Sequence, residues 1–233
     1  MSEKILIFTA TYNESKNIEN FIRLIDSLKI KLDLLIIDDN SPDGTSEIAK
    51  KFKTKNINLK LVSRPKKEGL DTAHKLAFRL SKEKKYDFLI TMDADLSHDP
   101  LKIPDFLTAL KSDTFVIGSR YIAGGKSDLK GSRLFMSYFG NKFIKNVFNI
   151  ECDEFTSSYR GFNLKNLTKF DLDIVSSKGY SFFMETVFQI NKKGFNIKQI
   201  PIYFSERKEG VSKIPKIEIF RTLFNVLKLK IKK

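Results

Sequence analysis

Several residue types that build particular kinds of protein are scarce in this sequence. Its 233 residues include one cysteine, Cys152, two histidines and no tryptophan. A single cysteine excludes a framework of internal disulfide bonds, and so few cysteines and histidines exclude a zinc site built from those residues. We therefore expect the chain to work in a reducing compartment, with Cys152 as an ordinary core or surface thiol.

Long hydrophobic segments are also missing. The apolar run at residues 5–8 is shorter than the core of a secretory signal peptide. Elsewhere the apolar stretches fall short of the roughly 20 residues that a helix needs to cross a bilayer. We therefore expect neither a signal peptide nor a transmembrane helix.

What the chain has in excess is positive charge. The sequence has 42 lysines and arginines against 28 aspartates and glutamates, which gives a formal net charge of +14. Its apolar content of 41% and charged content of 30% are typical of a globular protein, and its length suits one sizeable domain. The charge predicts an anionic partner: a nucleotide, a phosphorylated substrate, a phospholipid surface or a nucleic acid. Nucleic acid is the weakest of these because the aromatic residues are not grouped with basic residues in a recognition signature.

Hydrophobic patterning divides the first half of the chain into alternating strands and helices. Short runs rich in β-branched residues predict strands, and apolar residues at steps of three and four predict helices. The predicted strands cover residues 4–9, 34–37, 58–63, 88–92 and 114–119, and the predicted helices cover residues 14–28, 46–52, 69–82 and 100–110. This alternation implies an α/β fold with a mainly parallel central sheet and flanking helices, in which ligands bind beyond the carboxyl ends of the strands.

Polar clusters follow three of these strands. Asp93 and Asp95 directly follow the fourth predicted strand, and side chains two residues apart on a strand point the same way. Two close carboxylates attract a hard divalent cation, and oxygen ligands favour Mg²⁺ or Mn²⁺ over zinc. A polar loop with ordinary turn residues is the alternative for each cluster alone. The three clusters together favour a site; they are Thr11-Tyr12-Asn13-Glu14, Asp38-Asp39-Asn40-Ser41 and Asp93-Ala94-Asp95.

The second half of the chain has a different character. Residues 121–132 are rich in glycine, serine and lysine, which indicates a loop. Residues 134–150 are strongly apolar with interleaved basic residues, which predicts either a buried pair of helices or an interfacial membrane segment. Residues 195–204 predict one more strand. Residues 216–233 predict a basic amphipathic helix that either lies on an anionic membrane or packs on the domain.

The motifs, taken in order, closely resemble family 2 glycosyltransferases of the dolichyl-phosphate mannosyltransferase (polyprenyl-phosphate sugar synthase) branch. Each block alone is weak evidence, whereas the ordered set covers most of the chain. The blocks are Thr11-Tyr12-Asn13-Glu14, Ile36-Ile37-Asp38-Asp39-Asn40-Ser41-Pro42-Asp43-Gly44-Thr45, Met92-Asp93-Ala94-Asp95-Leu96-Ser97-His98, Gly118-Ser119-Arg120-Tyr121, Phe155-Thr156-Ser157-Ser158-Tyr159-Arg160 and Tyr180-Ser181-Phe182, followed by Arg207, Gly210, Ser212 and Lys213.

The resemblance implies a GT-A, Rossmann-like fold and inverting transfer of one sugar, usually from GDP-mannose, to a polyprenyl monophosphate. It implies a nucleoside pocket lined by Ala10, Tyr12, Glu14, Ile37 and Asp39. It also implies a metal held by Asp93 and Asp95 on the donor diphosphate, with Ala94 beside the nucleotide and Ser97 as a candidate third ligand. By the same resemblance, Arg120, Arg133 and Ser137 bind the lipid phosphate, and Arg207 and Lys213 close over the diphosphate.

Some residues depart from that family's pattern. Ala10 stands where proline is usual, and the tryptophan often found in the acceptor loop is absent. These departures leave the charged ligands in place, so they bear on the identity of the sugar and the lipid. A UDP-sugar donor, with glucose or an aminosugar transferred to polyprenyl phosphate or to a surface glycan, is the alternative within the enzymes. A catalytically silent scaffold of the same fold is a further alternative.

The resemblance and the patterning together predict the organisation and location of the chain. Residues 1–211 form the catalytic domain, residues 121–150 supply its acceptor loop and interfacial helices, and residues 212–233 form the basic amphipathic C-terminal helix. We expect peripheral attachment to the anionic cytoplasmic face of a membrane, with a separate membrane protein as a candidate anchoring partner and no nucleic acid bound.

Overall fold

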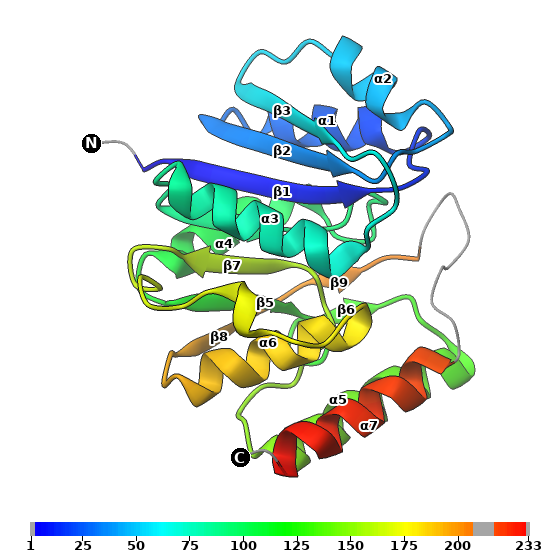
Figure 1. Ribbon diagram of the computed structural model, residues 1–233, viewed down its shortest axis with the longest axis vertical. Coiled ribbons are helices and arrows are strands. Elements are labelled where there is room, and N and C mark those ends of the chain that lie inside the picture. The colour runs from blue at the N-terminus through cyan, green and yellow to red at the C-terminus, as the bar shows by residue number, and fades with distance from the viewer. Residues whose placement is uncertain (1–2, 207–216, 232–233) are drawn as a thin grey trace.

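A central sheet of seven strands organises the protein, which is described here by a computed structural model of residues 3–206 and 217–231. The strand order in the sheet is β3-β2-β1-β4-β7-β5-β8 (Figure 1). Its strands are β1 (Ile5–Thr11), β2 (Leu32–Asp38), β3 (Ile57–Ser63), β4 (Phe88–Thr91), β5 (Phe115–Ser119), β7 (Arg160–Asn163) and β8 (Ile197–Pro201). Two further strands, β6 (Lys126–Ser127) and β9 (Tyr203–Phe204), form a small parallel sheet.

Helices cover both faces of the sheet, as predicted. They are α1 (Ile18–Ser27), α2 (Thr45–Lys51), α3 (Leu70–Glu83), α4 (Ile103–Leu110), α5 (Gly131–Phe148), α6 (Tyr180–Lys192) and α7 (Ile217–Ile231), with short 3₁₀ helices at Pro100–Lys102 and Leu172–Ile174. The α/β fold class and the first five strands expected from the patterning are confirmed, with boundaries shifted by a few residues.

The three strands that carry the polar clusters run in the same direction. β1 lies between β2 and β4 and is parallel to both, with Phe8 opposite Thr91 and Thr11 opposite Asp38. The carboxyl ends of β1, β2 and β4 therefore meet at one edge of the sheet, which we call the donor edge. This confirms that the three polar clusters lie at the same edge, where open α/β sheets bind their ligands.

One strand of the sheet is absent from the prediction. β7 lies between β4 and β5 and is antiparallel to both, with Arg160 opposite Thr91 and Ile117. Its four residues, Arg-Gly-Phe-Asn, include only one large apolar side chain, so their pattern gives little strand signal. The strand brings residues 154–158, which precede it, to the donor edge.

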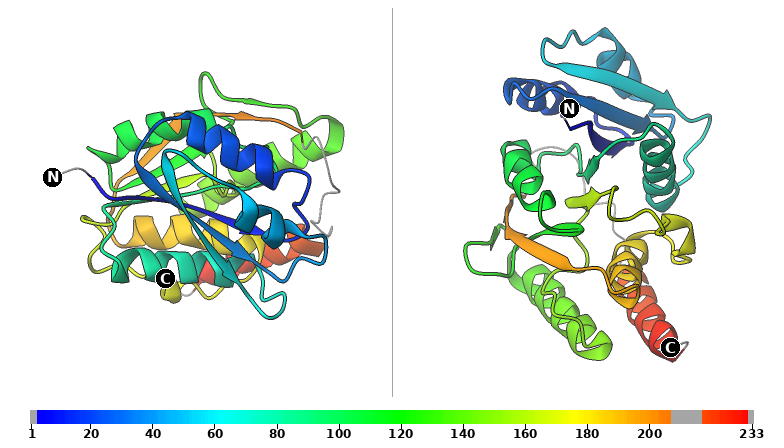
Figure 2. Two further views of the ribbon diagram at one scale, coloured as in Figure 1. Left: turned by 90° about the horizontal axis from the view of Figure 1, so that it is seen from above. Right: turned by 90° about the vertical axis from the view of Figure 1, so that its left-hand side faces the viewer.

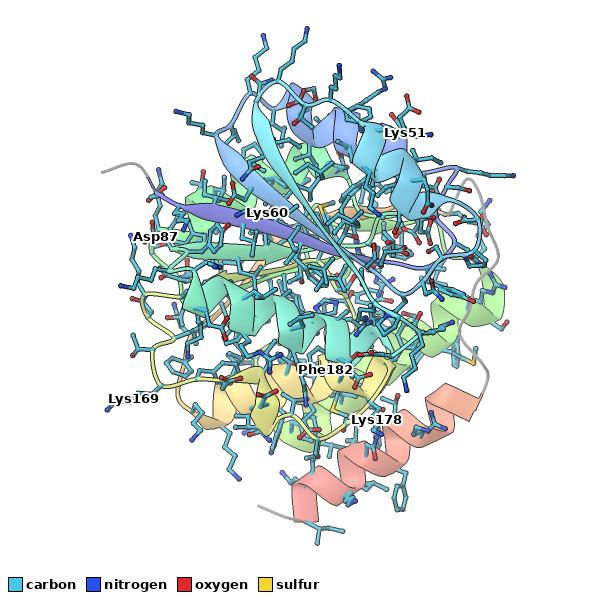
Figure 3. The ribbon with its side chains drawn as sticks, turned by 45° about the horizontal axis from the view of Figure 1, so that its top comes forward. Lys51, Lys60, Asp87, Lys169, Lys178 and Phe182 are labelled. Atoms are coloured by element: carbon cyan, nitrogen blue, oxygen red, sulfur yellow. The ribbon has the colours of Figure 1, made fainter. Side chains whose placement is uncertain are left out.

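The core has two layers because side chains alternate along the strands. Leu6 and Phe8 of β1 pack in the cluster that includes α3 and α6, whereas Ile5 and Ile7 pack in the cluster that includes α1, α2 and α4. On the first side, Phe182 of α6 is fully buried between α6 and α3, with its ring centroid 5.7 Å from that of His74 (Figure 3). The two layers make the sheet a rigid support for the loops at its edge.

Helices α5 and α7 form the base of the molecule, at the opposite end from β3 (Figures 1 and 2). Residues 131–148 form one continuous helix, so the predicted buried pair of helices is wrong. Apolar side chains occur all around α5, and one helix can bury only the face that packs on the domain. Its buried residues are Asn141, Ile144 and Phe148. Within the described residues, no helix has both the length and the apolar content that crossing a membrane requires.

The strand expected over residues 195–204 is two short strands, β8 and β9. Pro201 ends β8, and the chain turns away from the main sheet there to pair with β6, which falls within the predicted loop. Proline cannot donate a backbone hydrogen bond, so a ladder ends readily at such a residue. The predicted boundary between residues 211 and 212 lies outside the described residues.

Candidate active site

A pair of carboxylates follows β4 at the donor edge, each held by a serine hydroxyl. The Ser158 hydroxyl donates to Asp93 Oδ1 over 2.7 Å, and the Ser97 hydroxyl donates to Asp95 Oδ1 over 2.6 Å. The backbone N–H of Ser97 also donates to Asp95 Oδ1, over 3.0 Å. Asp95 is buried and Asp93 is half-buried. Both carboxylates are therefore fixed in orientation by hydrogen bonds from the protein.

Left-handed backbone conformations mark the turn after each of the three strands. Asn13 follows β1 with φ of 57°, Asn40 follows β2 with φ of 56°, and Leu96 follows β4 with φ of 62°. A branched side chain such as leucine adopts this region at a cost of about 1–3 kcal/mol and only where the surroundings enforce it. The turn is tied to β9 and the residue after it: the Ser205 hydroxyl donates to the Leu96 carbonyl over 2.9 Å. Such strain gathers at functional sites, which supports a site at this edge.

The loops after β1 and β2 are joined by short hydrogen bonds around Asp38. The hydroxyls of Thr11 and Ser41 donate to Asp38 Oδ1 over 2.7 and 2.6 Å. The Asn13 N–H donates to the Ser41 hydroxyl over 3.0 Å, and the Glu14 N–H donates to the Thr45 hydroxyl over 2.9 Å. These bonds set the positions of Tyr12 and Glu14 above the ends of the two strands.

Asp39 is oriented by an arginine that the sequence analysis did not single out. Asp39 is buried beside Arg64, and their side chains form an ion pair. Gly69 N–H donates to Asp39 Oδ2 over 3.2 Å, while Arg64 also donates to the Thr72 hydroxyl over 2.6 Å and to the Gly69 carbonyl over 3.0 Å. The start of α3 and the end of β3 thus hold the Asp39 carboxylate in place.

The other predicted nucleoside residues lie around the same corner but differ in exposure. Tyr12 is half-buried, with Lys67 Nζ 4.0 Å from the centroid of its ring. Glu14 Oε2 accepts a hydrogen bond from Asn17 Nδ2 over 2.9 Å. Ala10 is half-buried, whereas the Ile37 side chain is fully buried in the core. Ile37 therefore offers only its backbone atoms to a ligand at this corner.

Arg120 lies beyond β5 and pairs with a buried carboxylate. Its Nε donates to Glu154 Oε2 over 2.8 Å, and its Nη2 donates to the Thr156 hydroxyl over 3.1 Å. Burial opposes charge on both groups, but the adjacent Glu154 carboxylate raises the pKa of Arg120 above its ordinary value. Burial also raises the pKa of Glu154, but the charge of Arg120 and the hydrogen bonds from Arg120 and Thr156 outweigh burial and leave that pKa below its ordinary value. The pair is thus a fixed, fully charged unit.

A cleft of about 440 Å³ opens between Arg120 and helix α5. One wall is polar, with Arg120 and Lys126, and the other is apolar and aromatic. The apolar and aromatic side chains lining it are Tyr121, Leu134, Phe135, Tyr138 and Phe139. Such a cleft suits an amphipathic ligand with an anionic head and an apolar tail.

Two predicted acceptor residues flank this cleft on α5. The Tyr121 hydroxyl donates to the Ser137 hydroxyl over 2.6 Å, and the Arg120 guanidinium carbon lies 5.3 Å from the Tyr121 ring centroid. Arg133 is exposed on α5, four residues before Ser137 and so on the same helix face. The structure therefore gathers Arg120 and Ser137 and places Arg133 on the nearby surface.

His98 and Phe204 connect the carboxylate pair to Arg120. His98 Nδ1 accepts a hydrogen bond from the Asp93 N–H over 3.3 Å, and its ring centroid lies 5.5 Å from that of Phe204. The Arg120 guanidinium carbon lies 4.5 Å from the Phe204 ring centroid. Burial lowers the pKa of His98, which keeps the imidazole neutral and able to accept that hydrogen bond. The carboxylates and the arginine are thus parts of one packed unit.

Several supporting residues escaped sequence reasoning. No role was predicted from the sequence for His98, Ser158, Glu154 or Arg64. Some of their contacts join residues that are far apart in the sequence. Glu154 is 34 residues from Arg120, and Ser158 is 65 residues from Asp93. The ordered motifs at residues 92–98 and 155–160 include His98 and Ser158, whereas Glu154 and Arg64 lie outside the motifs. The predicted diphosphate ligands Arg207 and Lys213 lie outside the described residues.

The donor set at Asp93 and Asp95 fits a hard divalent cation. Within residues 3–206 and 217–231, no group of three or more histidine, cysteine, aspartate or glutamate side chains is placed to hold a metal. Mg²⁺ and Mn²⁺ do not need such a cage, because they are commonly bound by one or two carboxylates together with substrate phosphates and water. Two aspartates, with the Ser97 oxygen nearby, meet that requirement.

Comparisons with known proteins agree with this geometry. An undecaprenyl-phosphate mannosyltransferase from Micrococcus luteus is 34% identical over 91% of this chain and 87% of its own length. A polyprenol monophosphomannose synthase from Mycolicibacterium smegmatis is 31% identical over 97% of this chain and 86% of its own length.

Solved structures share the fold at low sequence identity. Glucosyl-3-phosphoglycerate synthase from Mycobacterium tuberculosis, in complex with Mn²⁺, UDP-glucose and glycerol 3-phosphate, has a TM-score of 0.68 at 17% identity, covering 98% of this chain and 80% of that one. A mannosyltransferase from Pyrobaculum calidifontis, in complex with GDP-Man and Mn²⁺, has a TM-score of 0.59 at 17% identity, covering 100% and 65%. These likenesses confirm the predicted GT-A fold.

The family is shown by a match over most of the chain. The profile described as Glycosyl transferase family 2 matches residues 6–171, a range that includes nearly all of β1, together with β2, β4, the Asp93–Asp95 pair, Arg120 and Glu154. Together with the two relatives that are more than 30% identical, this match confirms the resemblance found in the motifs. The chain belongs to glycosyl transferase family 2.

Proposed function

We propose that this protein transfers mannose from GDP-mannose to a polyprenyl monophosphate, with inversion at the anomeric carbon and with Mg²⁺ or Mn²⁺ on the donor diphosphate. The mannosyl and polyprenyl parts of the proposal are supported by the two mannosyltransferase relatives, which match nearly the whole chain. GDP-mannose as the donor follows from the family resemblance and from the chemistry of the site.

One observation carries the proposal: a carboxylate pair suited to a divalent cation is linked, through two packed side chains, to an arginine that lines an apolar cleft. His98 and Phe204 bridge Asp93 and Arg120. A sugar nucleotide held at the donor edge would place its anomeric carbon between these two groups. An acceptor with a phosphate head and an isoprenoid tail matches the polar and apolar walls of the cleft.

The donor is held by groups of two kinds. Tyr12, Glu14 and Asp39 line the nucleoside corner with Ala10 and the backbone of Ile37, and Asp93, Ala94 and Asp95 meet the diphosphate. Ser97 is the candidate third metal ligand, since a hydroxyl that donates to Asp95 keeps lone pairs of its own. When bound, the cation neutralises charge that develops on the departing diphosphate. Arg207 and Lys213 are proposed to add positive charge to the same group.

The acceptor needs to be held rather than activated. A phosphate monoester, with a second pKa near about 6, is largely a dianion at neutral pH and is itself a nucleophile. Arg120, held by Glu154, together with Arg133 and Ser137 would orient it. Its oxygen forms a bond to the anomeric carbon as the bond from that carbon to the GDP oxygen breaks, and GDP leaves with the bonding electrons. Attack from the opposite face inverts the configuration.

The exposed apolar surface of the base supports attachment to a membrane. Phe135, Met136 and Phe139 of α5 and Phe224 and Ile231 of α7 are exposed. Lys228 and Lys230 lie in the last turn of α7. Aromatic and aliphatic side chains beside lysines are typical of helices that lie on anionic bilayers. We propose that this surface rests on the cytoplasmic leaflet, so that the polyprenyl tail enters the cleft from the membrane.

A donor panel tests the reaction. The purified protein is incubated with polyprenyl phosphate, Mn²⁺ or Mg²⁺, and labelled GDP-mannose, UDP-glucose or UDP-N-acetylglucosamine, and lipid products are separated. We expect mannosyl phosphopolyprenol from GDP-mannose only, and a product in which the anomeric configuration is inverted. Turnover of a UDP-sugar without turnover of GDP-mannose would reject the mannose assignment in favour of the alternative donor.

A membrane protein that anchors the enzyme remains a prediction from the sequence. A pull-down tests this prediction. The tagged full chain and a variant that ends after Phe220 are each recovered from membranes without detergent, and the proteins bound to them are compared. Recovery of the same integral membrane protein with the full chain is the expected outcome.

A further inference from the structure

Ser158 connects the antiparallel strand β7 to the carboxylate pair. Its side chain is 4% exposed, and its hydroxyl donates to Asp93 Oδ1 over 2.7 Å. These two residues are 65 positions apart in the sequence. The contact therefore exists only because β7 lies beside β4 in the sheet.

The backbone at Ser158 is fixed by the strand that ends before Asp93. The Thr91 hydroxyl donates to the Ser158 carbonyl over 2.6 Å, and Thr91 is opposite Arg160 in the ladder between β4 and β7. Arg160 Nε donates to the Ser157 carbonyl over 2.7 Å. The Ser158 hydroxyl is thus offered to Asp93 from a rigid position.

The two carboxylates are supported in different ways. Asp95 accepts a hydrogen bond from the hydroxyl of Ser97, which is only two residues away, so this bond forms within one turn. Asp93 accepts its hydrogen bond from the hydroxyl of Ser158, which reaches it because β7 is paired with β4. The rotation of the Asp93 carboxylate is therefore tied to the relative placement of β4 and β7.

We propose that Ser158 is a positioning residue for the divalent cation: its hydroxyl fixes the rotation of the Asp93 carboxylate in the orientation that binds metal. The inference rests on the proposed function, since it takes Asp93 as a metal ligand. Hydrogen-bond partners of metal-binding carboxylates typically change metal affinity by about 10–100-fold when they are removed. The donor hydroxyl reduces the repulsion between Asp93 and Asp95 before the metal arrives, and orients Asp93 for it.

Ser158 also belongs to the segment that holds Arg120. Glu154 and Thr156, which bind the Arg120 guanidinium, precede it by four and two residues. The segment of residues 154–158 therefore fixes the metal carboxylate at one end and the acceptor arginine at the other. The distance between Asp93 and Arg120 determines how far the departing diphosphate lies from the attacking phosphate. Ser158 fixes the Asp93 end of that distance.

The test measures metal binding directly. Free Mn²⁺ is followed by electron paramagnetic resonance as the protein is titrated in the presence of GDP, for the wild type, Ser158→Ala and Ser157→Ala. Ser157 is the matched control, because it is equally buried and its hydroxyl accepts from the Tyr159 N–H over 3.2 Å instead of contacting Asp93. Ser158→Cys, which is similar in size to serine but a weaker donor, covers the case in which alanine unfolds the protein.

We expect Ser158→Ala and Ser158→Cys to weaken Mn²⁺ binding about tenfold, and Ser157→Ala to leave it within twofold. In turnover assays, the Mn²⁺ concentration for half-maximal rate should rise by the same factor, while the rate at saturating Mn²⁺ stays within a few-fold of the wild type. Unchanged Mn²⁺ binding in the Ser158 variants, or an equal loss in Ser157→Ala, would overturn the inference alone. A wild-type protein that binds no Mn²⁺ with GDP would overturn the metal role in the proposed function as well.

Discussion

The donor edge and the α5–α7 base differ in how far their side chains are bound or buried by the rest of the protein. At the donor edge the carboxylates of Asp38, Asp93 and Asp95 all accept hydroxyl hydrogen bonds over 2.6–2.7 Å. At the base, large apolar side chains are left in contact with solvent: Phe135 is 61% exposed and Ile231 is 84% exposed. These three carboxylates thus have hydroxyl partners within the protein, whereas the base has unburied apolar area.

This difference matches the ligands proposed for the two regions. A small, highly charged donor is bound well by groups that are oriented before it arrives, because little reorganisation is then needed. An isoprenoid tail and a bilayer have no fixed shape, so an apolar surface of any orientation binds them through the hydrophobic effect. The Arg120–Glu154 pair lies at the border of the two regions. Like the carboxylates of the donor edge, it is held in place by a contact within the protein.

The largest expected effect comes from removing a carboxylate at the donor edge. Asp93→Asn and Asp95→Asn should each lower mannosyl transfer by about 10³-fold, because the metal supplies several kcal/mol of transition-state stabilisation. Thermal stability should change little, since asparagine keeps an oxygen that accepts the serine hydroxyl. Product formation and calorimetric Tm are measured together. Full activity in either variant would refute the metal role, whereas no transfer by the wild type with any donor would favour a catalytically silent scaffold.

A somewhat smaller effect is expected at the border. Arg120→Met should lower transfer by about 10²–10³-fold through lost orientation of the acceptor phosphate. It should also destabilise the fold by about 3–5 kcal/mol, because Glu154 is left as an unpaired buried charge. Chemical denaturation measures the stability. The double variant Arg120→Met/Glu154→Gln should recover most of the stability and none of the activity; recovery of both would remove Arg120 from the acceptor site.

A third prediction concerns the base alone. Replacing Phe224, Leu227 and Ile231 of α7 with serine should weaken sedimentation with anionic vesicles at least about tenfold, since each apolar side chain contributes about 1.5–3 kcal/mol when fully buried. Transfer to a short, water-soluble polyprenyl phosphate should be unchanged. The matched control is Leu101→Ser/Ile174→Ser, which removes two exposed apolar residues from other elements and should bind vesicles like the wild type. Equal binding by all variants would argue against the role of α7.

The last prediction concerns the buried His74 and is expected to affect turnover least. It is a dependence of the free energy of unfolding on pH. Burial lowers the pKa of His74 to about 3, so the folded protein keeps this imidazole neutral while the unfolded chain protonates it below about 6.5. The unfolded state therefore binds more protons in this range, and the free energy of unfolding should fall by about 1.4 kcal/mol per pH unit for this residue as the pH drops from 6.5 towards 4.5.

The buried His98, whose pKa is also lowered by burial, adds a contribution of the same sign. His74→Phe, in a site already lined by Phe8, Phe182 and Phe183, should make the slope shallower while leaving activity at pH 7 intact. Urea denaturation at pH 4.5, 5.5 and 6.5 measures this. The same slope in the variant would show that His74 is not the group responsible.

The sequence predicted the donor edge better than the border or the base. Strand periodicity placed β1, β2 and β4, and their parallel order followed from the alternation with helices, so Thr11, Asp39 and Asp93 were correctly expected at one edge. The base was predicted only as two alternatives, because apolar residues all around one helix do not say which of them are covered. β7 was missed because four residues with one large apolar side chain give almost no periodic signal.

The sequence alone determined the chemistry that this protein carries: its few cysteines and histidines, its excess of basic residues, and its ordered motifs at the ends of strands, which identify its family. Tertiary structure decided which partners those groups have. Glu154 reaches Arg120, Arg64 reaches Asp39, and Ser158 reaches Asp93 only after strands distant in sequence are paired. Local periodicity records which side of a strand is buried, but the contact between two distant loops depends on how the whole sheet is assembled.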